Sequence, residues 1–277
     1  MDPVGIVKNG SVMEITLDRP PVNAISQATS YALHAAFDEL AKSPDLLVGI
    51  LTARGRIFSA GWDLKEFSQQ EDQTGPTDLG PGGLGGFTEN WQLKKPVIAA
   101  VNGHAIGGGC EMLFAADIIV AAEGATFKLP ETRVGMLPDG GGIQRISKRL
   151  PYNVATDLIL TGRAMSAAEA MHWGLVKEVV PAGRVLLRAR EIAAEIVEGA
   201  PLAVVAAKEV LEALHFLPAR ESFEKTRSGW RGQSGMPHYE AMLRSDDYRE
   251  GSRAFVERRK PNWSDAQAGS VSDDQEA

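Results

Sequence analysis

Apolar and polar positions along the first two thirds of the chain alternate in a way that predicts strands followed by helices. Residues 12–17 alternate as a half-buried strand does, and residues 28–41 have the spacing of an amphipathic helix. Two apolar runs without polar alternation, at residues 46–52 and 96–102, indicate buried parallel strands. This pattern predicts an α/β core with largely parallel pairing.

The pattern changes twice further along the chain. Residues 69–87 are rich in Gly, Pro, Asp and Gln and have no apolar period, so we expect a mobile loop there. From residue 166 onward the composition favours helices over strands, and the helical segments are 184–198, 202–214 and 240–259. Residues 264–277 have no apolar face, which predicts a disordered tail.

Composition and charge narrow the class of protein. The chain of 277 residues is 44% hydrophobic and 23% charged, which is ordinary for a soluble globular protein. Its net charge of −7 argues against a nucleic-acid surface, since phosphate binding requires a basic patch. The least polar stretch, residues 96–110, is too short and too polar to span a membrane, and residues 1–10 have no apolar targeting core. We therefore expect a cytoplasmic protein without a nucleic-acid or membrane partner.

Two common kinds of cofactor site are not predicted. Cys110 is the only cysteine, and the His, Asp and Glu residues show no metal-ligand spacing, so no metal site is expected. Residues 80–85 match the Gly-x-Gly-x-x-Gly spacing of dinucleotide sites. No strand pattern precedes them, however, so the match fails its structural test.

The pattern with the clearest chemical meaning is Gly107-Gly108-Gly109-Cys110-Glu111, between a strand and a helix. Glycines ahead of a helix let a substrate oxygen approach backbone N–H groups and the positive end of the helix dipole. A second carboxylate follows at Glu131. A carbonyl that becomes an enolate needs such donors, and proton transfer beside it needs an acid and a base. The unit therefore predicts proton-transfer chemistry next to a carbonyl.

Each of these residues also has a structural interpretation. Glu111 could be an ordinary first-turn acid, which is favourable at any helix N-terminus. Asp139, in Pro138-Asp139-Gly140, could be a turn residue or a third carboxylate of the same pocket. His104 has no paired acid in its motif, and Cys110 is better explained as a small packing residue than as a nucleophile.

Taken together, the motifs resemble the crotonase, or enoyl-CoA hydratase/isomerase, superfamily, and the likeness covers roughly residues 12–263. The stretches that carry it are Ile15-Thr16-Leu17-Asp18-Arg19-Pro20, Asn23-Ala24-Ile25, Phe58-Ser59-Ala60-Gly61-Trp62-Asp63-Leu64, Lys95-Pro96-Val97-Ile98-Ala99-Ala100-Val101-Asn102-Gly103, the Gly107 to Asp117 block, Leu129-Pro130-Glu131, Gly141-Gly142-Ile143-Gln144-Arg145 and Phe255-Val256-Glu257-Arg258-Arg259-Lys260.

The resemblance implies a particular fold and assembly. The expected fold is an α/β spiral of ββα units over residues 1–195, followed by a helical trimerisation region at 196–263 and the tail at 264–277. The expected assembly is a homotrimer or homohexamer. The expected ligand is an acyl-CoA thioester, and no metal or redox cofactor is implied.

The resemblance also implies roles for individual residues. The backbone N–H groups of Trp62 and Gly108 would form an oxyanion hole, and Glu111 and Glu131 match the two glutamates of members that add water across a 2,3 double bond. Further substrate contacts are implied for Ala60, Asp63, Leu64, Lys65 and Gly107. Basic groups for the CoA phosphates would be Lys65 and, from a neighbouring subunit, Arg258 or Lys260, and Phe255 would pack on the adenine.

Within the superfamily, Ser59 to Lys65, the Gly80-Pro81-Gly82-Gly83 stretch and Trp173-Gly174 resemble the carnitinyl-CoA dehydratase branch. Plain hydratases have a Pro-Gly-Ala-Gly-Gly-Thr turn where this chain has Asp139. The function expected is reversible hydration and dehydration of a CoA thioester, with Glu131 on the α-proton and Glu111 on the water. The alternatives are a double-bond isomerase using Asp139 and Glu131, and a non-catalytic binding protein with the same fold.

Overall fold

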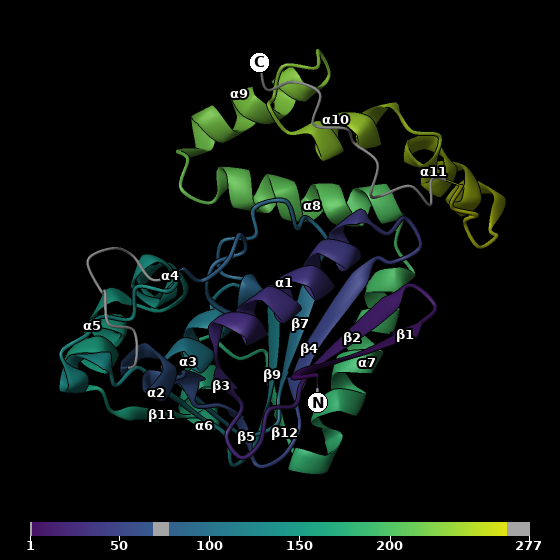
Figure 1. Cartoon of the computed structure of the whole chain (residues 1–277). Helices are drawn as coiled ribbons and strands as arrows, with labels where there is room; N and C mark the ends of the chain where they lie inside the picture. Colours follow the sequence, from purple (N-terminus) through teal and green to yellow (C-terminus); the bar gives the residue numbers. More distant parts are fainter. Residues whose placement is uncertain (1, 69–77, 265–277) are drawn as a thin grey trace.

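The computed structural model describes residues 2–68 and 78–264 and is built around a six-stranded sheet (Figure 1). The order in this sheet is β1-β2-β4-β7-β9-β12, in which β1 and β2 are antiparallel and the remaining neighbours are parallel. The strands are β1 (Val4–Asn9), β2 (Val12–Leu17), β4 (Val48–Ala53), β7 (Val97–Val101), β9 (Ile118–Ala122) and β12 (Glu178–Val180). All residues of β4 and β7 are buried, as their continuous apolar runs predict.

A second sheet of four strands has the order β11-β10-β8-β5, and β3 pairs with β6 in a separate two-stranded sheet. These short strands are β3 (Ala24–Ile25), β5 (Ile57–Ser59), β6 (Gly61–Trp62), β8 (His104–Ile106), β10 (Thr126–Lys128) and β11 (Ala164–Ser166). Three times the chain passes from a strand of the first sheet to one of the second, through β4–β5, β7–β8 and β9–β10. A helix follows each such pair, so the core is a spiral of ββα units.

Helices cover the six-stranded sheet, with α1 in front of it and α7 behind it in Figure 1. Ser26 caps α1, because its hydroxyl accepts a hydrogen bond from the Thr29 N–H. The core helices are α1 (Gln27–Lys42), α2 (Leu64–Ser68), η1 (Leu84–Gly86), α3 (Gly108–Leu113), η2 (Glu131–Val134), α4 (Gly142–Arg149), α5 (Tyr152–Thr161), α6 (Ala167–His172), η3 (Ala182–Arg184) and α7 (Val185–Val197).

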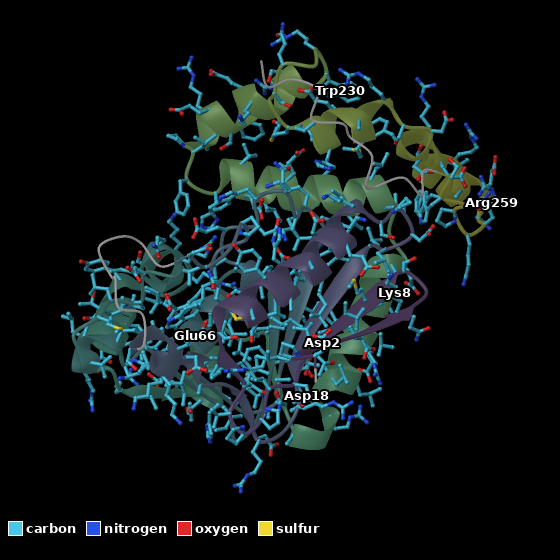
Figure 2. The ribbon with its side chains drawn as sticks, viewed as in Figure 1. Asp2, Lys8, Asp18, Glu66, Trp230 and Arg259 are labelled. Atoms are coloured by element: carbon cyan, nitrogen blue, oxygen red, sulfur yellow. The ribbon has the colours of Figure 1, made fainter. Side chains whose placement is uncertain are left out.

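The C-terminal helices form a layer of their own beyond one end of the core (Figure 1). They are α8 (Pro201–Leu214), α9 (Ala219–Gly229), α10 (Pro237–Arg244) and α11 (Asp247–Glu257). Lys208 ties α8 to the core, since its ammonium group lies 2.9 Å from the Asp117 carboxylate and 3.1 Å from the Lys95 carbonyl oxygen. Trp230 and Arg259 mark this layer in Figure 2, and several large apolar side chains on it are exposed, among them Trp230 and Phe255.

Three local predictions were wrong. The helix expected at 240–259 is two helices, because the backbone is extended at Ser245, whose hydroxyl accepts a hydrogen bond from the Tyr248 N–H. The sequence pattern missed α9, in which polar residues dominate. Residues 78–87 are packed, since Leu84 and Phe87 are buried and the Phe87 ring stacks on Phe37.

The remaining parts of the predicted loop and tail, residues 69–77 and 265–277, lie outside the described residues. Within the residues that are described, no helix has both the length and the apolar character required to cross a membrane.

Candidate active site

Two backbone N–H groups meet where β6 approaches the start of α3. The N–H of Asp63 donates to the Ile25 carbonyl oxygen of β3 at 2.9 Å. Because successive N–H groups of a strand point to opposite sides, the Trp62 N–H points away from β3. Gly108 is the first residue of α3, so its N–H has no acceptor within the helix. A Cβ atom built on Gly108 would lie 3.3 Å from the Trp62 nitrogen. The structure thus brings together the two donors predicted for the oxyanion hole.

The approach is so close that Gly61 cannot carry a side chain. A Cβ atom on Gly61 would lie 2.6 Å from the Ile106 carbonyl oxygen and 2.7 Å from the Gly108 nitrogen. Gly61 also has a φ of +85°, in the left-handed region. A Cβ atom on Gly108 would lie 2.8 Å from a methyl carbon of Leu84. A side chain on Gly61 would therefore push the two donors apart, whereas one on Gly108 would first displace the Leu84 side chain.

A polar network that the sequence analysis did not identify holds β3 and β6 in place. The Arg19 guanidinium donates to the Ala24 carbonyl oxygen at 2.9 Å and to the Asp63 carboxylate at 2.7 Å. The Asn23 amide donates to two backbone carbonyl oxygens at 2.8 Å each, and the Ser59 hydroxyl donates to the Asn23 carbonyl oxygen at 2.7 Å. Arg19, Asn23 and Ser59 belong to the motifs quoted above. The sequence signal that could have revealed the network is the pair of polar residues, Arg19 and Asn23, on either side of Pro20-Pro21.

Asp63 is the predicted substrate contact that this network uses. Its carboxylate pairs with Arg19 and accepts hydrogen bonds from the N–H groups of Lys65 and Glu66. The hydrogen bond from Arg19 lowers the pKa of Asp63, so the carboxylate is ionised and its bonds lie within the protein. This geometry assigns Asp63 a supporting position beside the oxyanion donors, and its contact with substrate stays a prediction.

Glu111 lies in the first turn of α3 and is only 4% exposed. The N–H of Gly142, the first residue of α4, donates to its Oε1 at 2.9 Å. A Cβ atom on Gly140 would lie 3.4 Å from its Oε2, so the glycines of the 140–142 turn let the backbone close over the carboxyl group. Burial raises the pKa of Glu111 to about 8 despite the Gly142 donor, and the charges of Glu131 and Asp139 add to the rise.

Glu131 is the first residue of η2, a short 3-10 helix. Its Oε1 lies 2.8 Å from where a Cβ atom of Gly107 would be, directly beside the residue that precedes Gly108. Its Oε2 is buried and has no hydrogen-bond partner in the protein. Burial raises the pKa of this carboxyl group, and the Asp139 charge adds to the effect. A buried, unpaired carboxylate oxygen beside the donor pair is a group prepared to act on a ligand.

Asp139 is exposed, and its carboxylate raises the pKa of both glutamates, so it lies within electrostatic range of each. Its backbone carbonyl oxygen accepts a hydrogen bond from the Gln144 amide at 2.8 Å, as expected of a residue that begins a turn before a helix. Asp139 and Gly141 also line a cavity of about 900 Å³ between α4, α8 and residues 87–94, which neither glutamate lines.

The other residues predicted to touch substrate surround the same position or lie on its rim. Gly107 caps α3, and the Ala60 N–H pairs with the Val22 carbonyl oxygen. Leu64 and Lys65 start α2 and are exposed. Leu84, which the sequence analysis did not single out, lies against both Gly108 and Gly140, since Cβ atoms on these glycines would be 2.8 Å from its side chain. Leu84 thus packs between the start of α3 and the 140–142 turn.

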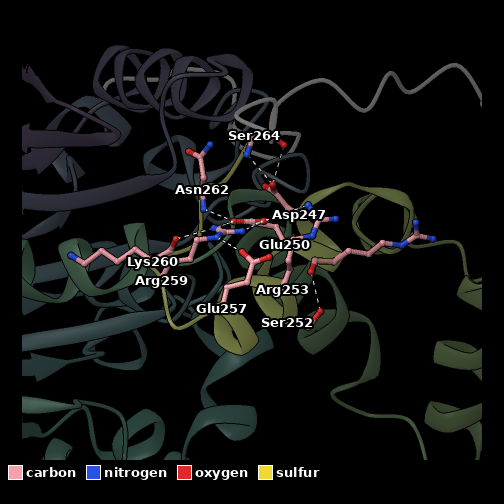
Figure 3. A network of polar contacts seen from close by, with 10 residues as sticks. Asp247, Glu250, Ser252, Arg253, Glu257, Arg259, Lys260, Asn262 and Ser264 are labelled. Atoms are coloured by element: carbon pink, nitrogen blue, oxygen red, sulfur yellow. Dashed lines mark hydrogen bonds and ion pairs between the residues drawn. The ribbon is translucent and has the colours of Figure 1, made fainter.

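The residues predicted to reach a neighbouring subunit's CoA lie at the far end of the chain, around α11. Phe255 is 84% exposed and Arg258, in a left-handed conformation, ends this helix. Figure 3 shows the polar network of α11 and the residues that follow it, in which Arg259 pairs with Glu250 and Glu257 while the Lys260 side chain extends away. In Figure 1, α11 lies far from α3, the helix that carries Glu111, so the predicted contacts of these groups depend on an oligomer and stay predictions.

Cys110 and His104, the two other residues considered for chemistry, have structural surroundings. Cys110 is buried, and burial raises the pKa of its thiol, which leaves it protonated and unreactive. His104 is exposed and its ring contacts the Thr126 hydroxyl at 2.9 Å. Among the residues that the structure describes, no group of three or more His, Cys, Asp and Glu side chains is arranged to hold a metal ion.

Comparison with known proteins agrees with this geometry. The model of the enoyl-CoA hydratase/isomerase family matches residues 7–267. A carnitinyl-CoA dehydratase of Salmonella typhi is 46% identical over 259 residues, which are 93% of this chain and 97% of that protein.

Solved structures lead to the same family. An enoyl-CoA hydratase from Mycobacterium tuberculosis superimposes with a TM-score of 0.84 at 36% identity, over 98% of this chain and 100% of that one. An enoyl-CoA hydratase from Bacillus anthracis gives 0.83 at 32% identity, over 96% and 99%. The predicted crotonase-like α/β fold is thereby confirmed.

Proposed function

Because the chain belongs to the enoyl-CoA hydratase/isomerase family, we propose that it catalyses reversible hydration of a 2-enoyl-CoA to a 3-hydroxyacyl-CoA at Glu111 and Glu131. The chain is a hydro-lyase of the enoyl-CoA hydratase kind. The observation that carries the assignment to these residues is the unpartnered Oε2 of Glu131 beside the backbone donors of Trp62 and Gly108.

In the proposed reaction, the thioester oxygen accepts hydrogen bonds from the Trp62 and Gly108 N–H groups. Removing the α-proton of the 3-hydroxyacyl thioester moves charge onto that oxygen, and fixed donors stabilise this charge as it develops. Each donor of this kind is worth about a hundred- to a thousandfold in rate. The positive end of the α3 dipole acts in the same direction.

The positions of the two glutamates divide the proton transfers between them. The α-carbon is bonded to the carbonyl carbon, so the base that reaches it must lie beside the oxyanion donors, and Glu131 does so through its contact with Gly107. Glu111 is three residues further into α3 and faces the 140–142 turn. We therefore assign Glu131 to the α-proton and Glu111 to the 3-hydroxyl group.

The pKa values suit these roles. At neutral pH Glu111 is protonated, since burial holds its pKa at about 8, and it can protonate the departing hydroxyl. The reverse reaction uses the same groups with their roles exchanged: Glu111 accepts a proton from the attacking water while Glu131 protonates the α-carbon. This direction requires the Glu111 carboxylate, so the rate of hydration should rise with pH through the pKa of Glu111, whereas the rate of dehydration falls.

The substrate proposed for this site is an acyl-CoA with a short acyl group, and a carnitinyl group is the first candidate because of the 46% identical relative. Asp139 supports this choice, since a third carboxylate raises the pKa of both glutamates and a cationic acyl group would offset its charge. We also propose that the chain works as a cytoplasmic homotrimer or homohexamer without a cofactor, with Lys65 and a neighbour's Arg258 or Lys260 on the CoA phosphates and Phe255 on the adenine.

The test is a spectrophotometric assay of the conjugated enoyl thioester, run with crotonyl-CoA and with crotonobetainyl-CoA on the wild type and Glu111→Gln. Fast loss of the conjugated absorbance that falls by about 10²–10⁴ in the variant would support the proposal. The preferred thioester then selects between a general and a carnitine-related substrate. No turnover of either thioester by the wild type would contradict the proposal for these substrates.

A double-bond isomerase that uses Asp139 with Glu131 is the second candidate, because Asp139 is electrostatically coupled to both glutamates. It predicts that Asp139→Asn abolishes turnover of a 3-enoyl-CoA while Glu111→Gln keeps much of it. The hydration proposal predicts the reverse ranking of these two variants on a 2-enoyl-CoA.

A further inference from the structure

The helix that carries Glu111 is weak by itself. α3 is six residues long and begins with Gly108 and Gly109. Its N-cap residue is a third glycine, Gly107, which has no side chain to make a capping hydrogen bond. Glycine is the least favourable helix former apart from proline, and helices this short are unstable in isolation. The orientation of Glu111 must therefore come from contacts with the rest of the protein.

One arginine holds the other end of this helix. Arg149 is the last residue of α4, and its Nη1 lies 2.5 Å from the Ala116 carbonyl oxygen. The same nitrogen lies 3.2 Å from the Phe114 carbonyl oxygen and 3.4 Å from that of Leu113. Leu113 ends α3 and Phe114 caps it, while Ala116 follows in the next turn, so the three carbonyls lie at and just beyond the C-terminal end of the helix. A cation at this end also suits the negative end of the helix dipole.

α4 therefore contacts α3 at two separated points. Its first residue, Gly142, donates its N–H to the Glu111 carboxyl group, and its last residue, Arg149, binds the carbonyls at the C-terminal end of α3 and just after it. The eight residues of α4 span about 12 Å. Two attachments at that separation prevent α3 from rotating against α4, whereas the Gly142 contact alone leaves a pivot.

From this arrangement, and resting on the proposed roles of the glutamates, we infer that Arg149 is a positioning residue for Glu111. It touches no reacting atom and acts by fixing the helix on which Glu111 stands. The charge of Arg149 does not change with pH in the range in which the enzyme is assayed. Burial lowers the pKa of its guanidinium and the Asp117 carboxylate opposes this, so the group stays protonated. Asp117 in turn pairs with Lys208 of α8, which links the C-terminal layer to the same junction.

The experiment compares Arg149→Met with Lys148→Met, which removes the neighbouring cation on the same helix. The Lys148 ammonium lies over the Phe216 ring at 4.6 Å, so its loss leaves α3 untouched. We expect Arg149→Met to lower kcat by roughly 10- to 100-fold with KM changed less than about threefold, because a misplacement of about 1 Å can cost that much. The pH limb of kcat that belongs to Glu111 should move to lower pH as water reaches the carboxyl group. Lys148→Met should match the wild type in all three quantities.

Amide hydrogen exchange in the substrate-free protein supplies a readout that does not depend on the proposed reaction. Peptides that cover residues 107–116 should exchange faster in Arg149→Met and unchanged in Lys148→Met. Unchanged exchange and unchanged kinetics in folded Arg149→Met would overturn the inference. If the wild type fails to hydrate either thioester, the exchange result still decides the role of Arg149, and only the proposed function fails.

A conservative variant decides the question if Arg149→Met does not fold. Arg149→Lys keeps the charge but replaces the rigid, planar guanidinium, whose Nη1 lies near all three carbonyls, with an ammonium group on a flexible stem. An intermediate kcat with a displaced pH limb would support the positioning role, and wild-type values of both would contradict it.

Discussion

The two glutamates of this site stand in contrasting surroundings although both lie close to the same three glycines. Glu111 is almost fully buried, accepts a backbone hydrogen bond from Gly142, and stands on a helix whose C-terminal end Arg149 of α4 contacts. Glu131 is half-buried in a single 3-10 turn, and its Oε2 has no partner. The Glu111 carboxyl group therefore has a hydrogen-bond partner within the protein, whereas Glu131 Oε2 is left to bind a ligand. The difference teaches that one site can hold a protonated carboxyl group and an unpartnered one close together.

The turn that carries Glu131 is fixed by its neighbours in sequence rather than by its own side chain. The Thr132 hydroxyl donates to the Ile159 carbonyl oxygen at 3.1 Å, and the Arg133 guanidinium donates to the Thr161 carbonyl oxygen at 2.6 Å. Both acceptors lie at the C-terminal end of α5. Glu111 thus depends on α4 and Glu131 on α5, the next helix in the chain.

The sharpest way to separate the two groups is to follow exchange of the α-protons of butyryl-CoA with deuterated water. This thioester has α-protons but no 3-hydroxyl group, so only the α-carbon base is needed. We expect Glu131→Gln to slow the exchange by about 10²–10⁴, the usual contribution of a general base, and Glu111→Gln to slow it far less. Proton NMR measures both rates, and equal losses in the two variants would refute the assignment of Glu131 to the α-proton.

A smaller effect on kcat is expected from adding a methyl group to the 140–142 turn, where it faces Leu84 and Glu111. In Gly140→Ala the new methyl group would lie 2.8 Å from the Leu84 side chain and 3.4 Å from Glu111 Oε2. We expect kcat to fall roughly tenfold because Leu84, which also lies against Gly108, must shift. Gly124→Ala is the control, since a Cβ atom there has no neighbour within 4 Å. Steady-state kinetics on the two variants measure the difference, which should be absent if the 140–142 turn simply moves away.

The buried carboxyl group should also appear in the pH dependence of stability. Its pKa is higher in the folded protein, about 8 against an ordinary value of 4.5, so folding favours the protonated form. Stability from this group is therefore complete below about pH 4.5 and is lost as the pH rises through 8. Glu111→Gln removes the ionisation, and its Tm should exceed that of the wild type by roughly 5 °C at pH 9, the effect of about 2 kcal/mol in a chain of this size. Thermal unfolding between pH 5 and 9 tests this, and a constant difference in Tm would rule out a raised pKa.

The smallest change is expected where the Glu131 turn joins α5. Thr132→Val keeps the shape but removes the hydrogen bond to the Ile159 carbonyl oxygen, which contributes about 1 kcal/mol. We expect a two- to fourfold fall in kcat and a Tm lower by about 2–4 °C. Thr226→Val, on α9, loses a comparable bond to the Ser222 carbonyl oxygen. Its Tm should fall while its kcat is unchanged, and a matching loss of kcat would show that the effect at Thr132 is not local.

The sequence predicted the parts of this molecule that follow from local pattern. The buried strands β4 and β7 and the amphipathic α1 were predicted from their apolar spacing. The glycine run before Glu111 indicated backbone donors, and the family resemblance implied the pair of Trp62 and Gly108. The contacts that position these groups were not visible, because they join residues far apart in the chain: Arg19 with Asp63, Arg149 with the carbonyls after α3, and Leu84 with Gly140. Residues 78–87 were expected to be mobile because Gly and Pro hide the two apolar side chains, Leu84 and Phe87, that pack on the core.

The two oxyanion donors are main-chain groups, and this has a consequence for how the protein can vary. No substitution of a side chain deletes an N–H group, apart from a change to proline, so the donors of Trp62 and Gly108 survive most mutations of their own codons. The same feature makes Gly61 a position of near-zero tolerance, because even an added methyl group would collide with backbone atoms 2.6 and 2.7 Å away. In a saturation library assayed for activity, only glycine should therefore be active at position 61, while many residues should be active at position 62.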